Sequence, residues 1–261
     1  MEVIIRATLD ACTSIAATIV AKHLRERKCP VLGLATGSTP ERLYAELIAM
    51  FRRGEISFGG CTTFNLDEYV GLDASHPQSY HYDMRTKLFD HVDLEPSRTH
   101  LLDGCSTDLR AECRDYEQRI STAGGIHLQI LGIGANGHIG FNEPFGSLSS
   151  RTWVKILSRR TLEDNARYFQ DRNDVPRQVI TMGVGTILKA AHCLVMAFGR
   201  QKAEAVCQMI EGPVTARCPA SALQLHRRTT VILDEPAACL LQHRADFEWI
   251  ERNKLPWQRY D

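Results

Sequence analysis

The chain turns from a strand into a helix in VLGLATGSTP, residues 31–40. Residues 31–34 are a short apolar run, which is typical of a buried strand. Thr39 is the predicted N-cap of the helix that follows, and Pro40 suits its first position, where a missing N–H costs nothing. The stretch therefore predicts one β-α unit with a turn of small residues at its centre.

The same alternation recurs along the rest of the chain. Further short strands are predicted at residues 61–64, 126–131, 193–198 and 231–233. Amphipathic helices are predicted at residues 12–20, 108–123 and 201–211. Strands that alternate with helices indicate parallel β-α-β units. We expect a single α/β domain over residues 1–261, with a doubly wound, mostly parallel sheet and helices on both faces in a Rossmann-like arrangement.

The composition excludes several classes of protein. The chain has 261 residues, with 31 basic and 31 acidic side chains, so we expect neither nucleic acid nor an anionic membrane as a partner bound by bulk charge. The nine cysteines include no C-x-x-C pair, which disfavours zinc and thioredoxin-like sites. No segment approaches the roughly 18 apolar residues of a membrane span, and no signal peptide is apparent. We expect a cytoplasmic protein with reduced thiols.

The turn in the opening stretch is a candidate phosphate site. Thr36, Gly37, Ser38 and Thr39 follow a strand and lead into a helix, where backbone N–H groups and the helix dipole favour an anion. The turn is neither G-x-G-x-x-G nor a P-loop, so a small phosphate ester is favoured over a dinucleotide or a nucleoside triphosphate. A tight turn with an ordinary helix cap explains these residue types almost as well.

Two adjacent acids follow the second predicted strand in FNLDEY, residues 64–69. Ligands of doubly wound sheets bind beyond the carboxyl ends of the strands, so Asp67 and Glu68 lie where a crevice would form. A carboxylate there could serve as a general base. Taken alone, a solvated loop with helix-capping acids is the simpler explanation.

A glycine-rich loop follows the next strand in GIGANGHIGFNEP, residues 132–144. It carries His138, the side chain most able to exchange a proton near neutral pH. Asn136 and Glu143 flank it and could orient or charge-couple its ring. A lone histidine is more often structural, but this combination after a strand favours a catalytic role.

Two cations complete the candidate site. Lys202 begins a helix after a strand, where a cation is favourable only if an anion is bound nearby. Arg167 lies in a polar segment rich in arginine and aspartate. A solvent-facing lysine is an equally good explanation for Lys202 taken alone.

Taken together, these segments resemble the glucosamine-6-phosphate deaminase (glucosamine-6-phosphate isomerase) family. The matches are collinear over roughly residues 30 to 236 and lie at 32–40, 63–72, 132–144, 148–152, 181–186, 199–203 and 234–236. The resemblance implies conversion of D-glucosamine 6-phosphate and water to D-fructose 6-phosphate and ammonia. This chemistry requires no metal and no cofactor, and its partner is a small sugar phosphate.

The resemblance also assigns roles to the candidate residues. His138 moves a proton between the anomeric hydroxyl and the ring oxygen, supported by Glu143 and Asn136. Asp67 then transfers a proton from carbon 2 to carbon 1 through a cis-enolamine. The phosphate is held by residues 36–39 together with Arg167 and Lys202, and Glu68 supports the site. Residues of about 157–180 are predicted to form a lid over the phosphate.

The chain departs from the family pattern in two places. Many members carry Asp where this chain has Asn136, which can hold an imidazole but cannot raise its basicity by charge. In allosteric hexameric members, N-acetylglucosamine 6-phosphate binds at a subunit interface through a basic pair. This region here contains Ser147 and Lys155, but Trp153 replaces the arginine. We expect weak or absent activation by that effector.

Three alternatives stay open at this point. A 6-phosphogluconolactonase shares the fold and the histidine loop, although lactonases tend to read Ser-Leu-Phe-Pro after the histidine. A sugar-phosphate sensor domain would keep the phosphate loop without catalysis, but an attached DNA-binding domain is expected there. The same reaction on galactosamine 6-phosphate differs by one or two hydrogen bonds to a hydroxyl. The family includes monomers and hexamers, so a homo-oligomer is compatible with the sequence.

Overall fold

Short apolar runs pair edge to edge into one parallel sheet in the computed structural model, which describes residues 1–169, 171 and 174–260. The strands of this sheet lie in the order β1 (Glu2–Arg6), β10 (Thr229–Asp234), β9 (Cys193–Ala197), β6 (Leu128–Leu131), β2 (Val31–Leu34), β3 (Thr62–Asn65) and β5 (Thr99–His100). Every neighbouring pair is parallel. The predicted mostly parallel, doubly wound sheet is confirmed.

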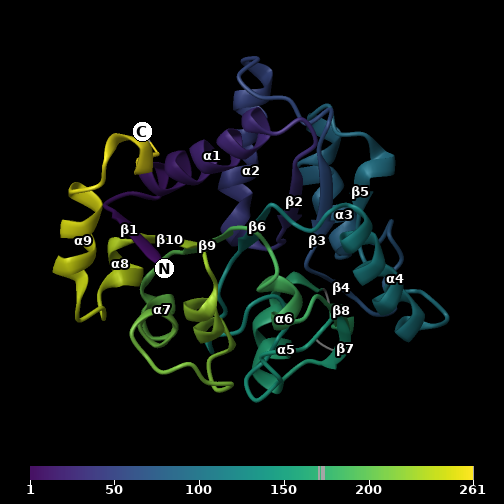
Figure 1. Ribbon diagram of the computed structural model, residues 1–261. Helices are drawn as coiled ribbons and strands as arrows, with labels where there is room; N and C mark the ends of the chain where they lie inside the picture. The colour runs from purple at the N-terminus through teal and green to yellow at the C-terminus, as the bar shows by residue number, and fades with distance from the viewer. Residues whose placement is uncertain (170, 172–173, 261) are drawn as a thin grey trace.

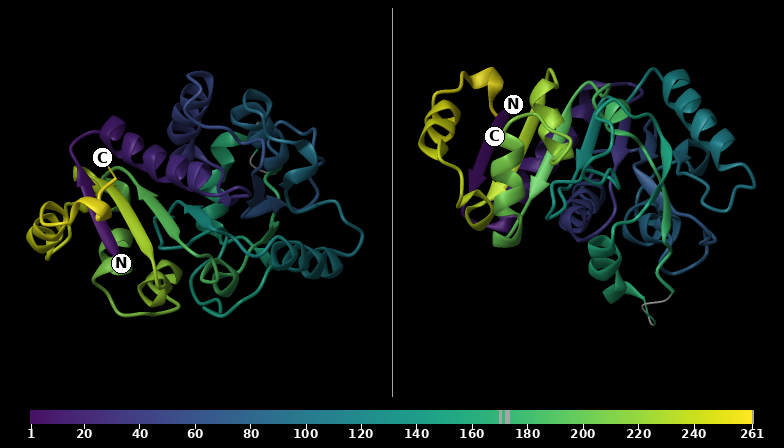
Figure 2. Two further views of the ribbon diagram at one scale, coloured as in Figure 1. Left: turned by 45° about the horizontal axis from the view of Figure 1, so that its top comes forward. Right: turned by 90° about the horizontal axis from the view of Figure 1, so that it is seen from below.

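Helices cover both faces of the sheet (Figures 1 and 2). One face packs against α1 (Leu9–Glu26), α2 (Ser38–Arg52) and α3 (Tyr80–Lys87). The other packs against α4 (Leu109–Thr122), α6 (Val184–Ile187), α7 (Ala203–Ile210) and α8 (Glu235–Ala238). Side chains alternate between the faces, as the pleat requires: Ile4 joins the first core, and Val3 and Ile5 join the second. Two buried cores thus share one sheet in a single α/β domain.

The remaining elements lie at the margins of these two cores. Helix α9 (Arg244–Arg252) lies beside the edge strand β1 (Figure 1). Arg6 of this strand pairs with Glu251 of the helix. Short 3-10 helices lie at η1 (Phe89–His91), η2 (Pro96–Arg98), η3 (Ala166–Tyr168), η5 (Arg200–Lys202), η6 (Pro219–Leu225) and η7 (Pro256–Gln258). Among the described residues, every helix is too short or too polar to span a bilayer.

A second, antiparallel sheet was not predicted from the sequence. It consists of β4 (Asp67–Tyr69), β8 (Gln178–Thr181) and β7 (Trp153–Ile156), with β8 in the centre. Helix α5 (Arg159–Asn165) follows β7 and leads toward β8. This sheet places the acidic segment of β4 against β8, a strand that begins more than a hundred residues later in the chain.

The boundaries of the predicted lid need correction. Its last residues belong to β8, where Val179 and Ile180 are fully buried, so the segment that could move ends before that strand. Residues 170, 172 and 173 of the predicted lid lie outside the described part of the chain. The lid itself stays a prediction, and its predicted residues are now those of the segment between β7 and β8.

The start of α2 also differs from the prediction. Gly37, not Thr39, is its N-cap, and the helix begins at Ser38, two residues earlier than expected. Gly37 has φ of 90°, a left-handed conformation that costs glycine little. The chain therefore turns sharply out of β2 at Gly37, and the N–H groups of Ser38 and Thr39 lie in the first turn of the helix.

Candidate active site

Four loops meet at one edge of the main sheet. Strands β9, β6, β2 and β3 are consecutive and parallel, so their carboxyl ends lie side by side. The loops that leave them carry the candidate residues predicted from the sequence, apart from Lys155 in β7 and Arg167 in the segment after it. Parallel pairing therefore brings together residues that are far apart in the chain, at the place where such sheets bind ligands.

The candidate phosphate loop lies beside Lys202. A Cβ added to Gly132 would be 3.6 Å from Thr39 Oγ1, so the start of the glycine-rich loop contacts the first turn of α2. Lys202 Nζ donates to the carbonyl oxygen of Ile133 at 2.7 Å, the residue next to Gly132. An ammonium group thus lies near a helix N-terminus with a left-handed glycine, which is a favourable arrangement for an anion.

His138 belongs to a fixed hydrogen-bond chain with Asn136 and Glu143. The His138 backbone N–H donates to Asn136 Oδ1 at 3.2 Å, and His138 Nδ1 lies 2.6 Å from the same oxygen. Asn136 Nδ2 in turn donates to Glu143 Oε2 at 2.7 Å. Because Oδ1 is an acceptor, Nδ1 of His138 must carry a proton, and Nε2 is then the basic nitrogen of the neutral ring.

Glu143 accepts two further hydrogen bonds, which the sequence did not indicate. Ser158 Oγ donates to Glu143 Oε1 at 3.0 Å, and Thr161 Oγ1 donates to the same oxygen. Burial alone would raise the pKa of Glu143, but the hydrogen bond from Thr161, the charge of His138 and the other donors together lower it below its usual value. Glu143 is therefore an anion near neutral pH.

Two glycines of this loop are needed for close approach. A Cβ on Gly134 would meet the His138 ring at 2.2 to 2.4 Å, so the imidazole rests directly on this backbone. A Cβ on Gly140, which has φ of 56°, would lie 3.4 Å from Asp67 Oδ2. The loop thus has His138 packed near one end and Asp67 against the other.

Asp67 is a buried acid with an unusual proton affinity. It is 6% exposed, and burial together with the neighbouring charge of Glu68 raises its pKa from 3.8 to about 8. Its partner in the second sheet is Thr181, whose hydroxyl accepts from the backbone N–H of Phe141 in the His138 loop. The second sheet therefore fixes Asp67 against that loop.

Glu68 has a different role from Asp67. It is fully buried and accepts hydrogen bonds from the backbone N–H groups of Tyr69, Tyr80 and His81, and it pairs with His81 Nδ1 at 2.9 Å. Glu68 thus caps the N-terminus of α3. The capping role agrees with the simpler explanation given for the two acids, but the solvated loop that this explanation assumed is wrong, because Glu68 is buried. Its contribution to the site is to fix β4 against α3.

An aromatic group beside Asp67 was missed by sequence reasoning. Tyr69, Tyr80 and Phe141 pack with ring centroids 5.1 to 6.1 Å apart. The side chain of Tyr80 interacts with those of Tyr69 and Thr36. Asn165 donates to the Tyr69 hydroxyl at 2.9 Å. The aromatic residues of FNLDEY and of α3 could have suggested buried rings, but the sequence held no signal for their proximity to Thr36.

The remaining predicted residues lie in different surroundings. Arg167 is exposed, with its guanidinium over the Tyr168 ring and donating to the Tyr168 hydroxyl at 2.8 Å, and no described contact joins it to the phosphate loop. Ser147 is exposed and bonds to Ser149. Lys155 Nζ lies 4.3 Å from the centre of the Trp153 ring. The structure thus brings the catalytic candidates, residues 36–39 and Lys202 together, but not these three.

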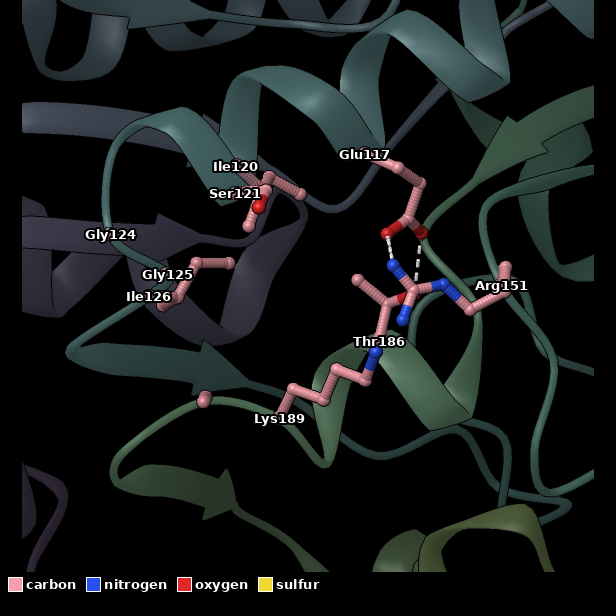
Figure 3. Close-up of a pocket in the computed structure, with 10 residues that line it drawn as sticks. Glu117, Ile120, Ser121, Gly124, Gly125, Ile126, Arg151, Thr186 and Lys189 are labelled. Atoms are coloured by element: carbon pink, nitrogen blue, oxygen red, sulfur yellow. Dashed lines mark hydrogen bonds and ion pairs between the residues drawn. The ribbon is translucent and has the colours of Figure 1, made fainter.

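A separate hollow of about 310 Å³ lies between α4 and α6 (Figure 3). Its polar wall is formed by Arg151 and Glu117, which form an ion pair, and by Thr186, which donates to Glu117. None of the candidate site residues lines it. Within the described part of the chain, no group of three or more histidine, cysteine, aspartate or glutamate side chains is arranged to hold a metal ion.

Comparisons with known proteins agree with the family resemblance. A family model described as glucosamine-6-phosphate isomerases/6-phosphogluconolactonase matches residues 6–232. The glucosamine-6-phosphate deaminase of a Thermoanaerobacter species is 48% identical over 92% of this chain and 95% of its own. That of Corynebacterium urealyticum is 48% identical over the whole of both chains.

Solved structures give the same result. A structure described as a monomeric glucosamine-6-phosphate deaminase is similar with a TM-score of 0.90 and 46% identity, over 92% of this chain and 100% of its own. The 6-phosphogluconolactonase of Thermotoga maritima has a TM-score of 0.71 at 17% identity, over 90% of this chain and 100% of its own. The second likeness concerns the fold alone.

Proposed function

Because the chain belongs to the glucosamine-6-phosphate isomerase/6-phosphogluconolactonase family, we propose that it converts D-glucosamine 6-phosphate and water to D-fructose 6-phosphate and ammonia. It is then an aldose–ketose isomerase coupled to deamination, acting in amino-sugar catabolism. The observation that carries the proposal is the buried Asp67 carboxyl, which lies against Gly140 of the loop that holds His138 and Glu143. Proton transfer at carbon requires such a base beside a group that opens the sugar ring.

Ring opening falls to His138. Its Nδ1 proton is held by Asn136, so Nε2 is the basic nitrogen, which takes the proton of the anomeric hydroxyl and returns it to the ring oxygen. The imidazolium formed between these two events is stabilised by the charge of Glu143, whose Oε2 lies 4.0 Å from Nδ1. Asn136 separates the two groups and fixes the geometry without adding charge.

Asp67 then moves the proton from carbon 2 to carbon 1. The C–H bond at carbon 2 breaks to give a cis-enolamine, and the proton held on the carboxyl is delivered to carbon 1. A carboxyl with a pKa of about 8 can both accept and return a proton near neutral pH, which an ordinary aspartate does poorly. Water adds to the resulting imine, the carbon–nitrogen bond breaks, and ammonia leaves.

The phosphate binds the loop of Thr36, Gly37, Ser38 and Thr39 with Lys202 in this proposal. The left-handed turn at Gly37 and the N-terminus of α2 favour an anion there. Arg167 would reach the phosphate only if the segment between β7 and β8 moves, because it is now directed at Tyr168. We retain that segment as a substrate-dependent lid.

The region of this chain that corresponds to the effector site of allosteric relatives differs from theirs at Trp153. Trp153 Nε1 donates to Asn142 Oδ1 at 3.1 Å, and Lys155 lies over the same indole. An indole cannot make the bidentate contacts to a phosphate that an arginine makes. We expect weak or absent activation by N-acetylglucosamine 6-phosphate, and therefore little or no regulatory role for Ser147 and Lys155. A rate titration at low substrate concentration tests this.

The experiment that tests the proposal compares three substrates. Ammonia release is measured with glucosamine 6-phosphate and galactosamine 6-phosphate, and acid release with 6-phosphogluconolactone. We expect rapid ammonia release from glucosamine 6-phosphate, whereas lactone hydrolysis alone would favour the lactonase branch of the family.

The nine cysteines, all free in the structure, support a reducing cytoplasm as the site of action.

A further inference from the structure

The start of α5 is built around the carboxylate of Glu143. Ser158 is the N-cap of this helix, and its Oγ accepts from the Thr161 N–H at 3.2 Å. The hydroxyl proton of Ser158 is left to donate elsewhere, and Glu143 Oε1 lies 3.0 Å away. Thr161, in the first turn of the helix, donates its own hydroxyl proton to the same oxygen.

These contacts are shielded from water. Thr161 is 4% exposed and Glu143 is 6% exposed, so water cannot readily replace a lost hydroxyl donor. A buried carboxylate without donors takes up a proton more easily, because its charged form is poorly solvated. The other oxygen of Glu143 accepts a hydrogen bond from Asn136. His138 is a titratable group that faces the same oxygen, with its Nδ1 4.0 Å away.

We propose that Ser158 and Thr161 are positioning residues that keep Glu143 ionised and directed at the Asn136–His138 pair. Thr161 is the stronger of the two, because its proton has Glu143 as its one described acceptor, whereas that of Ser158 is shared between Glu143 and the Thr161 hydroxyl. An anionic Glu143 stabilises the imidazolium of His138 during ring opening. This last step rests on the proposed function, whereas the hold on Glu143 does not.

The test replaces Thr161 by valine, which keeps the shape and removes the hydroxyl. The carboxyl groups of the glutamates are labelled with ¹³C, and the Glu143 signal is identified by its absence in Glu143→Gln. We expect the midpoint of its titration to rise by about one pH unit in Thr161→Val, because hydrogen bonds to charged groups are strong. Ser158→Ala should shift it in the same direction by less.

Two further variants separate a specific effect from a structural one. Thr161→Ser restores a hydroxyl and should return the midpoint toward that of the wild type. Thr13→Val removes another buried helical hydroxyl, which donates to the carbonyl oxygen of Leu9, and it should leave the titration of Glu143 unchanged. If both Thr161→Val and Ser158→Ala titrate like the wild type, the proposal is overturned.

A kinetic readout then links the hold on Glu143 to the reaction. With glucosamine 6-phosphate, kcat of Thr161→Val should fall about tenfold with little change in KM, because the group acts on a proton transfer and not on the phosphate. A rise in KM at constant kcat would contradict a role in ring opening. If the wild type releases no ammonia, the proposed function fails, and the carboxyl titration still decides the role of Ser158 and Thr161.

Discussion

Replacing Asp67 by asparagine should stabilise the protein near neutral pH while abolishing turnover. The folded carboxyl has a pKa of about 8, whereas an unfolded aspartate has its ordinary value of 3.8. Between these values the unfolded chain releases a proton that the folded chain retains. The free energy of unfolding therefore falls as the pH rises from 3.8 toward 8.

The size of the effect follows from this difference. At pH 7 the folded carboxyl is mostly protonated and the unfolded one is ionised, which lowers the stability of the wild type by on the order of 4 kcal/mol relative to strongly acidic pH. The asparagine amide has the same shape as the carboxyl but does not titrate, so the variant does not lose this stability as the pH rises. The stability advantage of Asp67→Asn should thus grow by roughly 3 to 4 kcal/mol between pH 4 and pH 7.

Urea unfolding at the two pH values measures this directly. Comparing variant with wild type at each pH cancels the titration of all other groups, which both proteins share. Asp108→Asn is the control, because backbone hydrogen bonds from Ala111 and Arg110 lower the pKa of this exposed N-cap, and its effect has the opposite sign. An Asp67→Asn advantage that is the same at pH 4 and pH 7 would refute the raised pKa of Asp67.

Three further predictions concern the loop, the phosphate site and the core. Gly134→Ala should displace the His138 imidazole by about 1 Å and reduce kcat roughly a hundredfold. Gly146→Ala is the control, because a Cβ there would lie 3.4 Å from its nearest neighbour, and it should change kcat little. Equal kcat values for the two variants would contradict this prediction. Lys202→Ala should raise KM for the phosphorylated substrate more than it lowers kcat, and an unchanged KM would count against a phosphate role. Burial lowers the pKa of His23 to about 4 and that of His192 to about 3. The free energy of unfolding should therefore be highest above pH 6.5 and fall by on the order of 3 kcal/mol per imidazole toward pH 4. Urea unfolding of His23→Gln should depend less steeply on pH than that of the wild type, and an equally steep dependence would contradict this.

The main sheet could be predicted because local patterns determine it. Strands and helices that alternate along the chain specify parallel pairing, and the glycine, proline and small residues at residues 36–40 mark one turn clearly. Strand β1 was not predicted, although its apolar run of Val3, Ile4 and Ile5 is as long as the one that predicted a strand at residues 231–233. The second sheet was missed because β4 has three residues and pairs with β8, which is distant in sequence, and no local signal exists for such a pairing.

The candidate site, like the fold, was predicted only where local sequence patterns determine it. Asp67, His138 and Glu143 follow strands and carry the residue types that proton transfer requires, so the pattern indicated them. The donors from Ser158 and Thr161 were not foreseen, because the fold of the intervening strand β7 brings them to Glu143. Glu68 was grouped with Asp67 as its neighbour, yet adjacent residues of a strand face opposite sides, and its carboxylate serves α3.

The most direct test of the account follows the proton at carbon. The enzyme and its Asp67→Asn variant are incubated with glucosamine 6-phosphate in deuterated water, and ammonia and deuterium at carbon 1 of fructose 6-phosphate are measured. We expect ammonia with the wild type, and deuterium at carbon 1 in those turnovers in which the proton on the Asp67 carboxyl exchanges with solvent before it is delivered. We expect neither with the variant, which should still bind the phosphate ester. Deuterium incorporation by the variant at the wild-type rate would contradict the central claim that Asp67 transfers this proton.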